Sequence, residues 1–312
     1  MAEIQLKEIN EAVRCSPERC ISEADFEYMR SVFSVADSLE ASDANIVLLA
    51  GPSGSGKTTT ANILRDHLAE KGHETVIVSL DDFYRNKDDP SYPRDEAGEL
   101  DYESVHALHT DKLRDSIARL LAGDDVVIPK YVFKKGASHY DNEPIRLKKG
   151  GFVIMEGLHA LNPIIVDGID KSRIMKMFIS VSTNINDGNE RVLSGRKVRF
   201  IRRMTRDSIY RGSTADSTLS RWQSVIEGEN EYLYPFKDTA DFRINTFHKY
   251  ELGVMKPFAE KAINDAGETM TGEYIGIVKN ALDRIEPLPI SILPETSLIR
   301  EFVPGGKYDA LY

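Results

Sequence analysis

The sequence predicts an α/β fold in which helices cover both faces of a parallel sheet. Short apolar runs alternate with longer segments of helical periodicity, and a glycine- and serine-rich loop joins one such run to a helix. The connection at Gly72 and His73 is short, as is usual between consecutive α/β elements. A chain of 312 residues has room for about two domains, or for one large α/β domain with additions.

The expected elements follow in order along the chain. Residues 1–44 are charged and mildly amphipathic, which predicts a helical appendage ending in a short linker. The α/β domain is expected over 45–286. Its expected strands are 46–50, 75–80, 126–128, 152–155, 174–181 and 242–245, and its expected helices are 58–71, 104–122, 190–232 and 254–266. A tail at 287–312 contains four prolines, and we expect it to run extended across the surface.

Composition excludes several classes of protein. Lys and Arg number 40 and Asp and Glu number 50, and this net charge of −10 argues against a general nucleic-acid-binding protein. No run approaches the ~18 apolar residues of a membrane span, so we expect no membrane association. Cys15 and Cys20 have no second Cys/His pair at zinc spacing, which favours reduced thiols and a cytoplasmic protein. The composition leaves open whether the protein forms a homo-oligomer.

One motif carries specific chemistry. The run GPSGSGKT at 51–58 matches the phosphate-binding pattern G-x-x-x-x-G-K-[ST], and it lies between an expected strand and an expected helix. Its glycines let backbone N–H groups surround phosphate oxygens, and the helix N-terminus adds partial positive charge. We expect Lys57 to reach the β- and γ-phosphates of ATP and the Thr58 hydroxyl to bind Mg²⁺. The expected nucleotide-binding residues are Gly51, Pro52, Ser53, Gly54, Ser55, Gly56, Lys57, Thr58 and Thr59. The fold is therefore expected to be of the P-loop NTPase type, with three layers.

Carboxylates at the ends of two strands are candidates for the remaining chemistry. A small-molecule kinase needs a carboxylate base, an acceptor pocket and positive charge over the transferring phosphoryl group. Asp81 and Asp82 follow the second strand, at the edge where open α/β sheets bind ligands, so one of them is a plausible base; the alternative is a turn or cap residue. Glu156, which follows the apolar run 152–155, is interpreted as a Mg²⁺ ligand, or else as a capping or salt-bridge carboxylate.

Positive charge is concentrated in residues 196–211, which hold seven Lys or Arg against one Asp. Arg199, Arg203 and Arg206 recur at spacings that place them on one face of a helix, with Arg202 beside them. This pattern suits a helical lid, at about 190–235, whose arginines stabilise phosphoryl charge. The alternatives are a nucleic-acid patch and an ordinary solvated helix face. Residues 82–149 are expected to form an inserted acceptor-binding region.

Several runs together resemble the uridine kinase and phosphoribulokinase family of P-loop kinases over residues 45–250. These runs are GPSGSGKTT, SLDDFYRN, ELDYES, PKYVF, VIMEG and RRMTRDSIYRG, while TLSRWQSVIEGENEYLYPF and LPETSLIREFVPGG are similar to bacterial uridine kinase-like nucleoside kinases. The resemblance implies a kinase that uses ATP and Mg²⁺ to phosphorylate the 5′-hydroxyl of uridine or cytidine. It implies that Asp81 is the base, with Asp82 where a serine usually stands. It matches Tyr84, Asp101, Tyr131 and Phe133 to nucleoside binding, and Arg203, Arg206 and Arg211 to the lid.

The sequence departs from the family where the base is recognised. A histidine of animal-type uridine kinases corresponds to Gly136, and the nearby His139 lies three positions later. Ser213 and Arg221 replace an arginine and a glutamine of the family pattern. Because buried hydrogen bonds discriminate between similar substrates, the acceptor stays open. A kinase for a non-nucleoside acceptor, such as a sugar phosphate or a pantothenate-like compound, and a non-catalytic nucleotide-binding regulator are the alternatives.

Overall fold

A five-stranded parallel sheet forms the centre of the computed structural model, which describes residues 2–95, 98–132, 135–140 and 143–311. Each strand pairs in parallel with its neighbours. In spatial order the strands are β10 (Phe242–Asn245), β7 (Ile174–Ser180), β2 (Ile46–Ala50), β6 (Phe152–Glu156) and β3 (Thr75–Ser79). The predicted α/β fold with a parallel sheet is confirmed.

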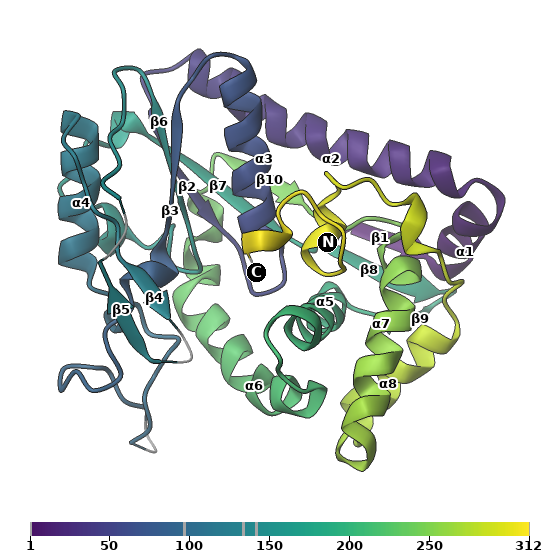
Figure 1. The fold of residues 1–312 in the computed structure, drawn as a ribbon. Helices are drawn as coiled ribbons and strands as arrows, with labels where there is room; N and C mark the ends of the chain where they lie inside the picture. The colour runs from purple at the N-terminus through teal and green to yellow at the C-terminus, as the bar shows by residue number, and fades with distance from the viewer. Residues whose placement is uncertain (1, 96–97, 133–134, 141–142, 312) are drawn as a thin grey trace.

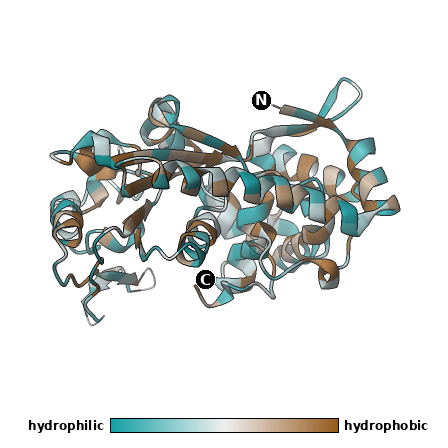
Figure 2. Ribbon diagram, turned by 90° about the horizontal axis from the view of Figure 1, so that it is seen from above, coloured by the Kyte–Doolittle hydropathy of each residue, from teal (hydrophilic) through white to brown (hydrophobic). Residues whose placement is uncertain are grey.

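Side chains of the sheet alternate between two apolar cores because successive residues of a strand point to opposite faces. Val47 and Leu49 of β2 join a core with α2 and α3, whereas Ile46 and Leu48 join a core with α4. The bounds of these helices are α2 (Pro17–Glu40), α3 (Lys57–Glu70) and α4 (Thr110–Ala122). Figure 1 shows α4 and α3 on opposite sides of the strands, and Figure 2 shows apolar colour along the strands between the helices.

A third apolar core lies beside the central sheet and contains a small sheet of three strands. Its strands are β1 (Ala2–Gln5), β8 (Thr183–Asp187) and β9 (Glu190–Leu193), and its helices are α1 (Leu6–Cys15), α5 (Gly195–Tyr210), α6 (Ala215–Tyr232), α7 (Glu251–Ala266) and α8 (Glu273–Asp283). A separate hairpin pairs β4 (Lys130–Val132) with β5 (Ala137–His139). None of the helices in the described ranges combines the length and apolar character that a membrane crossing requires.

Three predicted elements differ from the structure. Val126 forms an isolated bridge with Ile145 where a strand was predicted at 126–128. The helix predicted over 104–122 begins at Thr110, after a short 3₁₀ turn. Residues 190–193 form β9 because they pair with β8, and the rest of the predicted helix 190–232 is divided into α5 and α6, which residues 211–214 separate. Strand formation depends on such partners more than on local periodicity.

The C-terminal tail, predicted to run extended over the surface, instead folds into 3₁₀ turns and packs into the molecule. The turns are Ile290–Ile292, Leu298–Glu301 and Asp309–Leu311. Leu298 and Phe302 are fully buried. Removing such large apolar side chains from water favours the docked arrangement over an extended one.

Candidate active site

The phosphate-binding loop lies between the carboxyl end of β2 and the first turn of α3. Gly54 and Gly56 have φ of +73° and +95°, which L side chains rarely adopt. A Cβ at Gly56 would lie 2.5 Å from a methyl carbon of Leu298. The first helical hydrogen bond of α3 runs from the Thr60 N–H to the Gly56 carbonyl, at 2.9 Å. The preceding N–H groups lie at a helix N-terminus, where anions bind. All nine residues predicted to bind nucleotide belong to this loop and turn.

The Lys57 ammonium lies against its own loop. Its Nζ donates to the carbonyl of Gly51 at 2.9 Å and to that of Pro52 at 3.4 Å. These neutral carbonyls hold the cation within the loop that the motif assigns to phosphates. The loop and its lysine thus have the shape and charge that a nucleotide triphosphate requires.

Glu156 ends β6 beside the strand that leads into the phosphate loop. In the sheet register it lies opposite Leu49 of β2 and Ser79 of β3. Burial and the nearby charge of Asp81 raise the pKa of Glu156 to about 7, and Lys57 opposes this rise. The Glu156 carboxylate therefore lies close enough to Asp81 and to Lys57 for their charges to affect it.

The donors predicted for Mg²⁺ have suitable chemistry. Thr58 supplies a hydroxyl at the start of α3, and Glu156 supplies a buried carboxylate. Among the described residues, no group of three or more His, Cys, Asp and Glu side chains forms a metal cluster. Mg²⁺ in phosphate-transfer sites is held by one or two protein oxygens together with substrate phosphates, so this small donor set fits the ion.

The two consecutive aspartates have different environments in the 3₁₀ turn after β3, Leu80–Phe83. The Asp82 carboxylate accepts a hydrogen bond from the Tyr131 N–H at 3.2 Å and pairs with Lys130 at 3.3 Å. Asp81 is exposed, and its charge acts on Glu156 and Arg211. Asp82 thus anchors the β4–β5 hairpin, while Asp81 faces the edge that carries the phosphate loop.

Tyrosines line the region predicted to bind the acceptor. The rings of Tyr84 and Tyr131 lie 5.6 Å apart, and the Tyr84 hydroxyl donates to the carbonyl of Tyr102 at 2.9 Å. The Asp101 carboxylate caps the following turn by accepting from the N–H groups of Glu103 and Ser104, at 3.0 and 3.1 Å. Phe133, also predicted to bind the nucleoside, lies outside the described residues.

The three predicted lid arginines meet at one buried carboxylate, Asp207. Arg206 donates to it at 2.8 and 2.9 Å, Arg203 lies 3.4 Å away and Arg211 lies 3.6 Å away. Burial opposes the charge of Asp207, but the three cations hold its pKa below the usual value. Arg203 also donates to the Ser53 hydroxyl at 2.9 Å, which brings the arginine cluster to the phosphate loop.

The family model for the phosphoribulokinase / uridine kinase family matches residues 46–252. The chain belongs to this family. It is an ATP-dependent kinase that acts on a small-molecule substrate.

Two kinds of relative accompany this match. Uridine kinase of Staphylococcus aureus strain JH9 is 30% identical to the kinase over 202 residues, which are 64% of this chain and 86% of that protein. A possible uridine kinase from Bacillus stearothermophilus has 15% identity and a TM-score of 0.43, over 70% of this chain and 99% of that chain. A provisionally assigned fructose transport system kinase from Silicibacter sp. TM1040 has 15% identity and a TM-score of 0.46, over 64% and 89%.

Two arginines of the predicted lid face have another place in the kinase. Arg199 pairs with Glu229 of α6 at 2.7 Å and donates to the carbonyl of Ser53 at 2.8 Å. Arg202 pairs with Glu251 of α7 and donates to the carbonyl of Gly54 at 3.2 Å. Both arginines are buried and bind carbonyl groups of the phosphate loop, so they are not exposed charges of a mobile lid.

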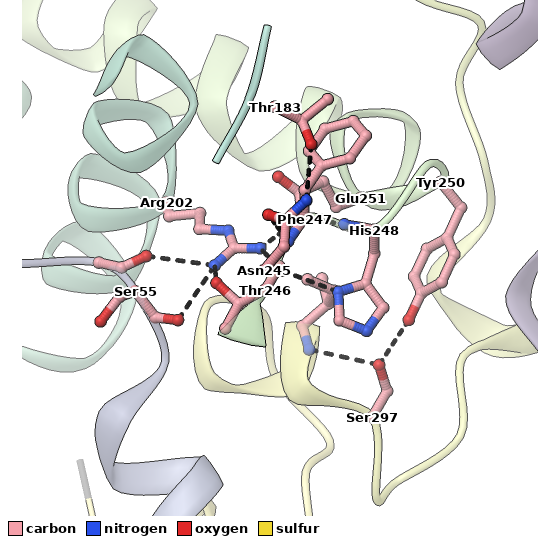
Figure 3. A network of polar contacts seen from close by, with 12 residues as sticks. Ser55, Thr183, Arg202, Asn245, Thr246, Phe247, His248, Tyr250, Glu251 and Ser297 are labelled. Carbon is pink, nitrogen blue, oxygen red and sulfur yellow. Dashed lines mark hydrogen bonds and ion pairs between the residues drawn. The ribbon is translucent and has the colours of Figure 1, made fainter. Parts of the chain in front are cut away.

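Figure 3 shows the contacts of Arg202 with the phosphate loop and with the segment after β10. The Arg202 guanidinium points toward Ser55 and toward the backbone of Thr246, which follows β10. The carbonyl of Thr246 is also 3.0 Å from Nδ1 of His248. The phosphate loop is therefore connected, through one arginine, to the segment between β10 and α7.

Several functional candidates were missed by sequence reasoning. Glu229 is buried, and its carboxylate accepts from the Ser53 N–H at 2.9 Å. A local signal was present, because Glu229 falls four positions after the apolar Val225 on the inner face of α6.

Burial, followed by the charges of Glu229 and Asp81, raises the pKa of Glu103 to about 7, although Arg203 opposes this effect. The side chain of His159 is buried, and neither of its ring nitrogens has a hydrogen-bond partner among the described residues.

Proposed function

We propose that the kinase transfers the γ-phosphoryl group of ATP·Mg²⁺ to the 5′-hydroxyl of a pyrimidine nucleoside, uridine or cytidine, with Asp81 as the base. The contrast between the two consecutive aspartates carries this proposal. Asp82 holds Tyr131 and Lys130, whereas the Asp81 side chain is exposed and has no hydrogen-bond partner among the described residues. Of these two aspartates, Asp81 is therefore the one available to an acceptor.

The reaction forms a bond between the acceptor oxygen and the γ-phosphorus, and it breaks the bond between that phosphorus and the β–γ bridging oxygen. Asp81 accepts the proton of the hydroxyl, and ADP leaves. Lys57 exchanges its loop carbonyls for phosphate oxygens. Arg203 and Arg206 stabilise the charge on the transferring group. Mg²⁺ on Thr58 and Glu156 would neutralise part of the phosphate charge.

The tyrosines favour an acceptor with a planar ring. Tyr84 is half-buried and packs at a tilt on the buried Tyr131 of the hairpin, while the exposed ring of Tyr102 lies 5.8 Å from the buried ring of Tyr92. Aromatic side chains bind nucleobases by stacking, which contributes about 1–3 kcal/mol per base. The accessible rings of Tyr84 and Tyr102 therefore favour a nucleoside over an open-chain acceptor.

A second candidate acceptor is an anionic sugar, such as a sugar phosphate. Gly136 stands where the family histidine is expected, and a Cβ there would lie 2.4 Å from Cδ of Lys87. The Lys87 ammonium lies 5.6 Å from the centre of the Tyr102 ring. A cation in place of an imidazole favours an acceptor that carries negative charge.

Acceptor-dependent release of ADP tests the proposed function. The panel contains uridine, cytidine, other nucleosides, ribulose 5-phosphate and pantothenate. We expect uridine or cytidine to stimulate ADP release, and we expect Asp81→Asn to lower kcat by about 10²–10⁴-fold while leaving the Kd of ATP nearly unchanged. A response to ribulose 5-phosphate alone would favour the second candidate.

Asp82→Asn is the matched control. Its amide oxygen can still accept the Tyr131 N–H, so this variant should retain most of the activity. Equal losses in the two variants would contradict the assignment of Asp81 as the base.

A further inference from the structure

The C-terminal tail reaches the phosphate loop. Leu298 lies against Gly56, and one turn later the Glu301 carboxylate accepts from the Thr59 N–H through Oε2 at 3.3 Å. Glu301 is only 4% exposed. The contact comes from outside residues 46–252, the part of the chain that matches the family model.

The same carboxylate also faces an arginine of the predicted lid. Oε1 of Glu301 lies 3.7 Å from Nη1 of Arg206. One anionic group thus lies between a backbone N–H in the first turn of α3 and a guanidinium. Both kinds of donor bind phosphate oxygens in proteins.

We infer that Glu301 occupies the position of a nucleotide phosphate group and competes with it for the Thr59 N–H and Arg206. The single Thr59 N–H cannot serve a phosphate oxygen and the Glu301 carboxylate at once, and two anions that meet beside Arg206 repel each other. Nucleotide binding then requires the Glu301 side chain to turn away. This inference rests on the ATP site of the proposed function and adds a residue that weakens nucleotide binding.

The rest of the tail is anchored independently of Glu301. The Ser297 hydroxyl lies 2.7 Å from the Tyr250 hydroxyl, as Figure 3 shows, and 3.4 Å from Asp25 of α2. Arg300 donates to carbonyl oxygens of the tail itself, among them those of Pro294 and Ile290. These contacts hold the turn while one side chain moves, so the exchange does not require the tail to unfold.

Nucleotide affinity distinguishes competition from a structural role. We expect Glu301→Gln to lower the Kd of ADP, measured by calorimetry, because the neutral amide lacks the competing charge. If the contact is formed in about nine molecules of ten, the Kd falls about tenfold. Glu295→Gln, an exposed tail residue, removes the same charge and should leave the Kd within about twofold of the wild type.

Unchanged or weaker ADP binding by Glu301→Gln, with Glu295→Gln normal, would overturn the inference and leave the proposed function intact. Absence of ADP binding by every protein, the wild type included, would contradict both. Glu301→Asp is the second variant, in case Glu301→Gln does not fold. The shorter side chain keeps the charge but withdraws the carboxylate from the Thr59 N–H, so the Kd of ADP should again fall, and an unchanged or higher Kd would overturn the inference.

Discussion

Glu229 joins two elements and the phosphate loop through a single carboxylate. It pairs with Arg199 of α5 and accepts from the Ser53 N–H, and both charged side chains are almost completely removed from water. Taking two charges out of water costs several kcal/mol each, and only the pair with its further hydrogen bonds offsets that cost. The pair is therefore weak evidence for added stability, but it couples the geometry of the phosphate loop to α5.

Breaking this pair should destabilise the kinase. Glu229→Gln leaves the Arg199 guanidinium buried without a carboxylate, so we expect the free energy of unfolding to fall by about 3–5 kcal/mol. Urea denaturation at pH 7 measures it. Glu227→Gln, on the exposed side of the same helix, should change stability by no more than about 0.5 kcal/mol. Equal stabilities of the two variants would contradict the buried-pair interpretation.

Asp25 of α2 connects the N-terminal segment to the C-terminal tail. This carboxylate lies near Ser297 and 3.5 Å from the buried His248, and Tyr250 donates to it. Burial raises the pKa of Asp25 to about 6, although the hydrogen bonds from Tyr250 and Ser297 oppose the rise. Burial lowers the pKa of His248 to about 3, so its ring is neutral above that pH and does not balance the charge.

The titration of Asp25 predicts a pH dependence of stability. Between pH 3.8 and about 6 the unfolded chain releases this proton while the folded kinase keeps it, so the contribution of Asp25 to stability falls as the pH rises through that window. The fall is at most about 3 kcal/mol, at about 1.4 kcal/mol per unit. Asp25→Asn should remove it. Unfolding curves at pH 4 and pH 7 compare the two proteins, and identical pH slopes would contradict the prediction.

The tail is part of the folded kinase and not an appendage. Leu293, Leu298, Ile299, Phe302 and Val303 are all buried against the rest of the molecule. Each such side chain contributes about 1.5–3 kcal/mol when it is fully removed from water. Their sum is comparable to the whole stability of a typical domain.

Removal of residues 287–312 should therefore prevent stable folding. We expect the shortened kinase to lose its cooperative thermal transition or to melt far below the full-length chain, as measured by circular dichroism. Removing only residues 309–312 leaves the buried cluster in place and should lower Tm by a few degrees at most. A shortened kinase that melts like the full-length chain would show that the tail is dispensable for folding.

Local sequence was sufficient for the central strands and for the phosphate loop. Apolar runs such as Ile46–Ala50 and Phe152–Glu156 form the predicted strands, and the pattern of glycines with Lys57 specifies its own turn and helix start. These features are encoded by contiguous residues, because turn chemistry and strand burial depend on near neighbours. The roles of the individual site residues stay predictions.

Long-range packing determined the rest. The helical spacing placed Arg199, Arg203 and Arg206 on one face. It could not show that Arg199 pairs with the buried Glu229, while Arg203 and Arg206 pair with Asp207. Nor could it show that Glu301 lies on the phosphate loop. Burial and ion pairing between distant segments depend on which surfaces meet, and periodicity along the chain carries no information about the partner.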